Sequence, residues 1–205
     1  MKKKFLSLMM AAAVVATTSV SAFADDYSWS DKIEQDVNVN ITGDVTSSTG
    51  DTVSGTLSVS IPTTTTFTVG QNGTVTAPAI TVQNRGTQAV DVYAYKFADN
   101  TPDANAGITV VGQDQLTSAT NYATVSLRLN GSAGDAYLKS EKGKNGVYTD
   151  LNCQNEASGT GAKLVSVAGN KTDTITLVGT TKDSAGAPTA AIQDKFVLTL
   201  KFKKA

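Results

Sequence analysis

The chain contains no histidine and only one cysteine, Cys153, among its 205 residues. The absence of histidine excludes Ser-His-Asp and Cys-His catalysis and the usual zinc sites. A single cysteine cannot form a disulfide within the chain. Cys153 lies in a polar stretch typical of a loop. We interpret it as a half-buried thiol without a role, and the alternative is an intermolecular bridge or a lipid site.

Enzyme motifs are also missing. The sequence has no G-x-S-x-G motif and no phosphate-binding glycine loop. Hydrolysis by paired carboxylates needs two of them converging on one cleft, about 5 to 10 Å apart. The acidic residues are instead scattered over predicted turns and strand ends: Asp91, Asp99, Asp103, Asp114, Asp135, Glu141 and Glu156. We therefore predict no enzymatic activity and no cofactor.

One loop contains several oxygen ligands of the kind that calcium prefers. Asp99, Asp103 and Asn105 lie in the predicted loop at residues 98–107. In the EF-hand pattern a glycine follows the acidic positions and a glutamate closes the loop six residues later. Gly107 falls one position early, and the closing glutamate is missing. Because turn chemistry explains the same residues, we predict no metal site here.

The charges nearly balance, with 17 basic and 18 acidic residues and a net charge of −1. After the first 24 residues neither sign clusters into a patch, which argues against nucleic acid as a partner. The lysines near the C-terminus alternate with apolar residues. We interpret them as a solvated strand face that discourages edge-to-edge pairing: Lys195, Lys201, Lys203 and Lys204.

The first 24 residues have the features of a secretory signal peptide. Three lysines precede an apolar run at residues 5–15, and Ala22-Phe23-Ala24 is a small-x-small cleavage pattern. The run is too short for a membrane span, which needs about 20 residues. We expect cleavage after Ala24, and a secreted mature chain with no membrane contact and a net charge of −4, since three lysines are removed.

The remaining sequence is rich in threonine and valine, which favour strands, and in turn-forming glycine, asparagine and aspartate. Apolar and polar residues alternate most clearly at residues 57–97 and 196–203. Turn signals at residues 84–88 and 169–170 predict two hairpins. The pattern predicts an all-β fold, an immunoglobulin-like antiparallel β-sandwich of about nine or ten strands over residues 53–205.

Residues 25–52 are predicted to be an N-terminal strand followed by a flexible linker. Val37, Val39 and Ile41 alternate with asparagines, and the residues up to 52 are small and polar. Trp29 lies outside any predicted strand and would anchor onto the domain or onto a neighbour. Strand 37–41 has two interpretations: a hairpin with residues 53–61, or addition to the sheet of another copy. In the second, Trp29, Val37, Val39 and Ile41 are the candidate assembly residues.

Three tyrosines are the candidate binding residues. Tyr93 and Tyr95 alternate with Val92 and Ala94. If the valine face is core, the two tyrosines form an exposed stripe on which sugars can stack; the alternative is that both faces are covered. Tyr148 lies in residues 141–161, the longest region of predicted irregular structure, where binding surfaces often occur.

The segment at residues 57–97 resembles a motif of secreted Gram-positive proteins. Its matching residues are Ile61-Pro62, Phe67-Thr68-Val69, the run ITVQNRG at residues 80–86, and Val90-Asp91-Val92. The pattern is similar to WxL-type cell-wall proteins and, more loosely, to camelysin-like biofilm fibre proteins. This resemblance implies a β-sandwich that binds or assembles outside the cell. The Trp-x-Leu signature is absent, and no functional residue is transferred.

These observations together predict a secreted, non-enzymatic structural or assembly protein of the cell surface or extracellular matrix, polymerising by strand addition. Its expected partners are other copies of itself or cell-wall polymers. The alternative function is a soluble cell-wall or carbohydrate-binding module, acting as an adhesin.

Overall fold

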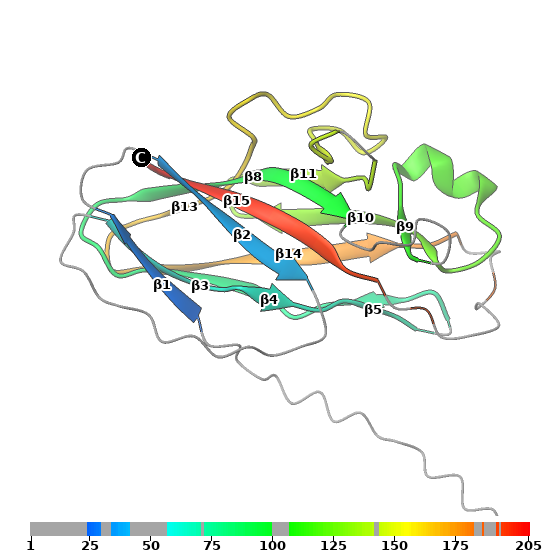
Figure 1. Cartoon of the computed structure of the whole chain (residues 1–205), viewed down its shortest axis with the longest axis horizontal. Helices are drawn as coiled ribbons and strands as arrows, with labels where there is room; N and C mark the ends of the chain where they lie inside the picture. Colours follow the sequence, from blue (N-terminus) through cyan, green and yellow to red (C-terminus); the bar gives the residue numbers. More distant parts are fainter. Residues whose placement is uncertain are drawn as a thin grey trace, which may run out of the picture.

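The computed structural model describes residues 24–29, 34–41, 57–70, 72–99, 107–141, 144–182, 186, 192 and 194–205. These residues form fifteen strands, mostly antiparallel, which confirms the all-β prediction (Figure 1). Five of the strands are only two residues long, so the number exceeds the nine or ten expected. A 3₁₀ helix, η1 (Gln113–Ser118), interrupts them. No helix among the described residues is long and apolar enough to cross a membrane.

The larger sheet has eight strands. Its order is β1 (Ala24–Trp29), β3 (Leu57–Pro62), β7 (Ile80–Asn84), β14 (Thr172–Thr180), β10 (Thr124–Gly131), β11 (Gly134–Leu138) and β12 (Val147–Tyr148), with β9 (Thr109–Val110) paired in parallel to β10.

The second sheet has five strands and contains the C-terminal strand at its centre. Its order is β13 (Ala162–Val167), β8 (Val90–Asp99), β15 (Phe196–Lys204), β2 (Glu34–Ile41) and β4 (Thr64–Thr65). A separate hairpin joins β5 (Thr68–Val69) to β6 (Val75–Thr76). The hairpin turn contains Asn72 and Gly73, and Gly73 adopts a positive φ of 76°.

A single hydrophobic core takes side chains from both sheets. In β7 the buried residues alternate with exposed ones, so one face of the strand meets the core. The core also includes fully buried side chains of β8, β10, β13 and β15. Burying each large aliphatic or aromatic side chain stabilises the fold by about 1.5–3 kcal/mol. The alternating apolar residues of these strands therefore favour the strand conformation that places all of them on the core face.

Two connections predicted to be hairpins pass instead from one sheet to the other. The residues after β7 lead to β8 in the second sheet, and those after β13 lead back to β14 in the first. The buried side chain of Asn84 joins these two corners. Its Nδ2 lies 2.7 Å from the carbonyl oxygen of Gln88 and 3.0 Å from that of Val167, and its Oδ1 accepts from the Gly86 N–H at 3.0 Å. These bonds favour a corner over a hairpin.

The N-terminal strands also pair differently from the prediction. β2 does not form a hairpin with β3. It pairs with β15 over eight residues and in parallel with β4. Trp29, expected outside any strand, ends β1 and is opposite Leu57 of β3. The predicted signal peptide lies outside the described residues except for Ala24, as does the predicted linker from residue 42 to 52.

Candidate functional site

The predicted assembly strand, β2, lies along one side of β15 (Figure 1). In the antiparallel register Ile41 is opposite Phe196, Val39 is opposite Leu198, and Val37 is opposite Leu200. Phe196, Leu198 and Leu200 are at most 1% exposed and belong to the core. Directly opposite residues share one face of a sheet. The three apolar positions of β2 therefore continue the core face of β15.

β15 is a central strand, which corrects the interpretation of its lysines. It pairs with β8 on one side and with β2 on the other. Lys201 is only 7% exposed, and Lys203 is partly buried. Both lie on the face of the sheet opposite the core. They belong to a packed polar surface rather than a solvated face, because the tyrosine rings of β8 lie against them.

The outer face of β8 carries Tyr93 and Tyr95. Val90, Val92 and Ala94 are fully buried, so the valine face is core and the two tyrosines lie on the other face, where they are partly buried. A bulge between the pairs Thr199–Lys96 and Leu200–Ala94 leaves Tyr95 as the extra residue. After the bulge the alternation shifts, which places Phe97 in the core.

Lysine ammonium groups lie over both tyrosine rings. Lys201 Nζ is 3.7 Å from the centroid of the Tyr95 ring, and Lys96 Nζ is 5.2 Å from the same centroid. Lys203 Nζ is 5.9 Å from the Tyr93 ring. These are cation–π contacts. The two rings share one face and are partly buried, and cations occupy much of the surface on which a sugar would stack.

Asp91 connects this stripe to β13. Its carboxylate accepts from Lys163 Nζ at 2.8 Å and from Ser166 Oγ at 2.6 Å, and the Tyr93 hydroxyl is 3.4 Å away. Burial alone would raise the pKa of Asp91. The hydrogen bonds from Lys163 and Ser166 and the charge of Lys163 outweigh burial and lower the pKa below its ordinary value. Asp91 is therefore held as a carboxylate.

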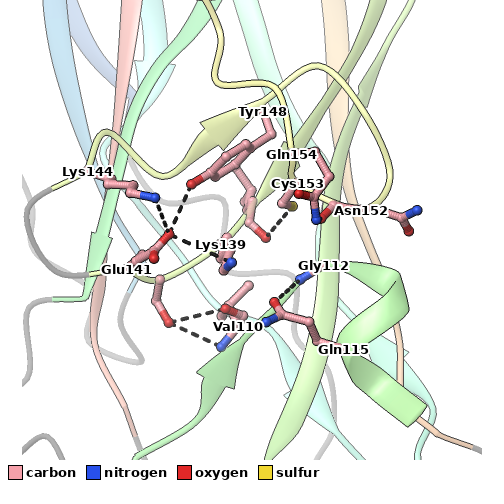
Figure 2. Close-up of polar contacts among 12 residues, drawn as sticks. Val110, Gly112, Gln115, Lys139, Glu141, Lys144, Tyr148, Asn152, Cys153 and Gln154 are labelled. Atoms are coloured by element: carbon pink, nitrogen blue, oxygen red, sulfur yellow. Dashed lines mark hydrogen bonds and ion pairs between the residues drawn. The ribbon is translucent and has the colours of Figure 1, made fainter. Parts of the chain in front are cut away.

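Tyr148, the third candidate binding residue, lies in the interior and not at the surface. It belongs to the short strand β12 and is 2% exposed. Figure 2 shows its hydroxyl directed at Glu141, with Oε2 at 3.3 Å. Burial, followed by the charge of Glu141, raises the pKa of Tyr148 to about 12. The residue is a buried hydrogen-bond donor that links β12, which pairs with β11, to the start of the loop at Glu141.

Glu141 is the centre of this polar cluster (Figure 2). Its Oε2 also lies 3.2 Å from Lys144 Nζ and 3.7 Å from Lys139 Nζ. Farther along the loop, the carboxylate of Asp150 accepts from the backbone N–H groups of Gln154 and Asn155. The partners named for Glu141 and Asp150 all lie between residues 139 and 155. These contacts therefore stabilise, from within, a segment that the sequence predicts to be irregular.

Cys153 is free and buried, at 5% exposure. Its Sγ lies 3.7 Å from the carbonyl oxygen of Leu138. Burial, with the charge of Asp150, raises the pKa of the thiol to about 12. A buried, protonated thiol is a poor nucleophile, so this geometry fits a residue used for packing.

No group of three or more potential metal ligands occurs among the described residues. Asp99 of the calcium candidate loop is described, whereas Asp103 and Asn105 lie outside the described residues. The residues that sequence reasoning missed are Asn84 and the lysines of β15. Asn84 falls within the run at residues 80–86 that carries the resemblance, and this was the available signal.

Comparison of the chain with protein-family models, with curated proteins and with solved structures finds no match.

Proposed function

We propose that this protein is a secreted, non-enzymatic structural component of the cell surface or extracellular matrix that assembles by strand addition. In this proposal the domain is an immunoglobulin-like sandwich, and β2 of one copy occupies the place beside β15 in the next copy. The observation that carries the proposal is the ladder of eight residue pairs between β2 and β15. It supplies main-chain hydrogen bonds and apolar side-chain positions, which are the two requirements of strand addition.

The position of β2 in the chain supports an exchange between copies. Residues 42–56 separate β2 from β3, and an extended chain of this length spans about 50 Å. That length is comparable with the size of a domain, so β2 can reach a neighbouring copy while covalently attached to its own. Without β2, the side of β15 that faces away from β8 would have no neighbouring strand. An exposed strand edge of this kind pairs readily with another strand.

The first experiment removes residues 25–45 from the mature protein. We expect polymers of the intact protein by negative-stain microscopy and light scattering, and a folded monomer after the deletion. A matched pair of variants separates sequence from length. Val37→Ser with Val39→Ser changes the core-face positions and should abolish polymers. Asn38→Ser with Asn40→Ser changes the opposite face and should retain them. An intact protein that stays monomeric at all concentrations contradicts the proposal.

The outer face of β8 favours a second candidate function, a module that binds a cell-wall polymer. Tyr93 and Tyr95 lie on the same face with lysine ammonium groups over their rings, and this combination suits an acidic polysaccharide better than a neutral one. Retention of the protein on wall polysaccharide should be lost in the variant Tyr93→Ala with Tyr95→Ala. Unchanged retention would remove this surface as the candidate.

A further inference from the structure

The outer face of the five-stranded sheet carries a row of alternating charges. Ser166 and the neighbouring Lys163 of β13 contact Asp91 of β8. Asp91 is opposite Lys203 of β15, and Lys203 is opposite Glu34 of β2. Two residues along the strands and on the same face, Lys201 is opposite Asp36. Glu34 and Asp36 of β2 are thus each opposite a lysine of β15, as Asp91 of β8 is.

The apolar positions of β2 specify its face but not its register. A slip of one residue would move its apolar positions to the outer face. A slip of two residues keeps the faces. In one such slip Val37, Val39 and Ile41 move opposite Phe202, Leu200 and Leu198, which are all core residues. Hydrophobic contacts alone therefore discriminate poorly between these registers.

The charges remove this ambiguity. In the observed register Lys201 of β15 is opposite Asp36, and Lys203 is opposite Glu34. The slip just described leaves Asp36 opposite Lys203 and moves Asn38 opposite Lys201. The slip in the other direction places Glu34 opposite Lys201 but moves Lys32 opposite Lys203, which places two like charges together. Opposite charges in directly opposed positions stabilise a sheet, and like charges destabilise it.

The other N-terminal strand offers no such pairing. Of its two acidic residues, Asp25 is opposite Ile61 and Asp26 is opposite Ser60 of β3. Ile61 is fully buried in the core. Charge complementarity is therefore a specific property of the β2–β15 ladder rather than a general feature of the N-terminal segment.

We propose that Glu34 and Asp36 form a charge code with Lys203 and Lys201, and that this code selects, in one register, the β2 strand of a second copy of this chain. The inference rests on the proposed function. It adds the identity of the partner strand and the reason that a strand lacking the two carboxylates is rejected.

The test uses two full-length variants with reversed charges. Glu34→Lys with Asp36→Lys reverses the strand, and Lys201→Glu with Lys203→Glu reverses the site that receives it. Either variant alone would place like charges together between copies, and we expect polymer formation to weaken about tenfold or more. An equimolar mixture restores both attractions, since each strand then meets a site of opposite charge. The mixture should therefore polymerise like the unaltered protein.

The quadruple variant with both reversals in one chain separates the inference from the proposed function. Polymers of this variant alone, together with polymers in the mixture, support both. If the mixture fails but the quadruple variant regains the melting temperature lost by the single reversals, the charge code operates within one chain and assembly by β2 is wrong. If each reversed variant polymerises unaided as well as the unaltered protein, the charge code is wrong and strand addition survives.

A control addresses the folding of the variants. Lys201 is nearly buried, so its replacement by glutamate affects the stability of the receiving domain. Reversal of the strand alone leaves the body of the domain unchanged, and this variant must retain the β-sheet circular dichroism spectrum. Lys171→Glu with Lys204→Glu changes two exposed lysines by the same net charge and should leave polymer formation unchanged. A loss in this control as large as in the Lys201 and Lys203 variant overturns the charge code in favour of a net-charge effect.

Discussion

β13 and β2 lie on the two sides of the central pair β8 and β15 in the same sheet, and they are held in different ways. β13 pairs with β8, and the carbonyl oxygen of its Leu164 also accepts from the Ala133 N–H at the turn between β10 and β11. β2 pairs with β15 and, over two residues, with β4. The two strands thus differ in what holds them besides their main ladder, and the proposed exchange between copies concerns β2 and not β13.

The largest expected difference comes from a carboxylate at a core position of each strand. Val165 of β13 is fully buried opposite Val92, so Val165→Asp should cost about 4 kcal/mol and unfold the domain. Val39→Asp is opposite Leu198 and should release β2 alone. Thermal unfolding followed by circular dichroism, with limited proteolysis near residue 40, measures both. Global unfolding of both variants would mean that β2 is as integral as β13.

The sequence predicted the strands better than it predicted their partners. Alternation identified residues 80–84, 90–97 and 196–203, because core burial imposes a period of two on each strand separately. It placed β7 with β8 and β13 with β14 in hairpins, although these pairs belong to different sheets. A short polar connection suits either geometry. What decides is the hydrogen bond from Asn84 to the carbonyl oxygen of Val167, which is 83 positions away, and the local sequence does not indicate this contact.

The same difference holds for the candidate binding residues: alternation predicts the face on which a residue lies but not the residues that contact it. The parity of Val90 and Val92 predicts that Tyr93 and Tyr95 lie on the face opposite the core, and they lie there partly buried. The sequence does not indicate that Tyr148 is buried, because β12 has only two residues and an alternation cannot be established over so short a length. The bulge at Tyr95 and the contacts of Lys201 and Lys203 with the rings come from pairing with β15, which is more than 100 positions away in the chain.

A second test weakens only the side-chain contact between β8 and β13. Asp91→Asn removes the charge that Lys163 and Ser166 contact. Because Lys163 is 39% exposed, solvent reduces the value of this pair, and we expect a loss of about 1.5 kcal/mol in urea unfolding. The same loss should occur in a chain lacking residues 25–45, since the side-chain partners of Asp91 are on β13 and β8 and not on β2. Unequal losses would indicate that the two sides of the sheet are coupled.

Replacement of Tyr95 tests the contact between the two central strands, β8 and β15, on the outer face of the sheet. Tyr95→Leu removes the ring below the Lys201 ammonium group, 3.7 Å away, and should cost about 1 kcal/mol because Lys201 is largely desolvated. Tyr95→Phe keeps the ring and should lose much less. Urea unfolding of the two variants distinguishes ring stacking from the hydroxyl group. Equal losses would assign the effect to the hydroxyl group instead.

Lowering the pH gives the smallest expected effect, and here it tests the charge of Asp91. Although burial opposes it, hydrogen bonding to Lys163 and Ser166 keeps the pKa of Asp91 below its ordinary value of 3.8. A carboxyl group whose pKa is lower in the folded state stabilises the fold fully above its unfolded pKa, and this contribution disappears as the pH falls through the folded value. The unfolding free energy should therefore decrease below about pH 4, by less than about 1 kcal/mol from this group, given the exposure of Lys163. Asp91→Asn should remove that part of the pH dependence. If the slope of the unfolding free energy against pH is the same in this variant and in the unaltered protein, Asp91 does not anchor β13 through its charge, and the hydrogen bonds of the backbone ladder are what distinguish this side of the sheet from the side occupied by β2.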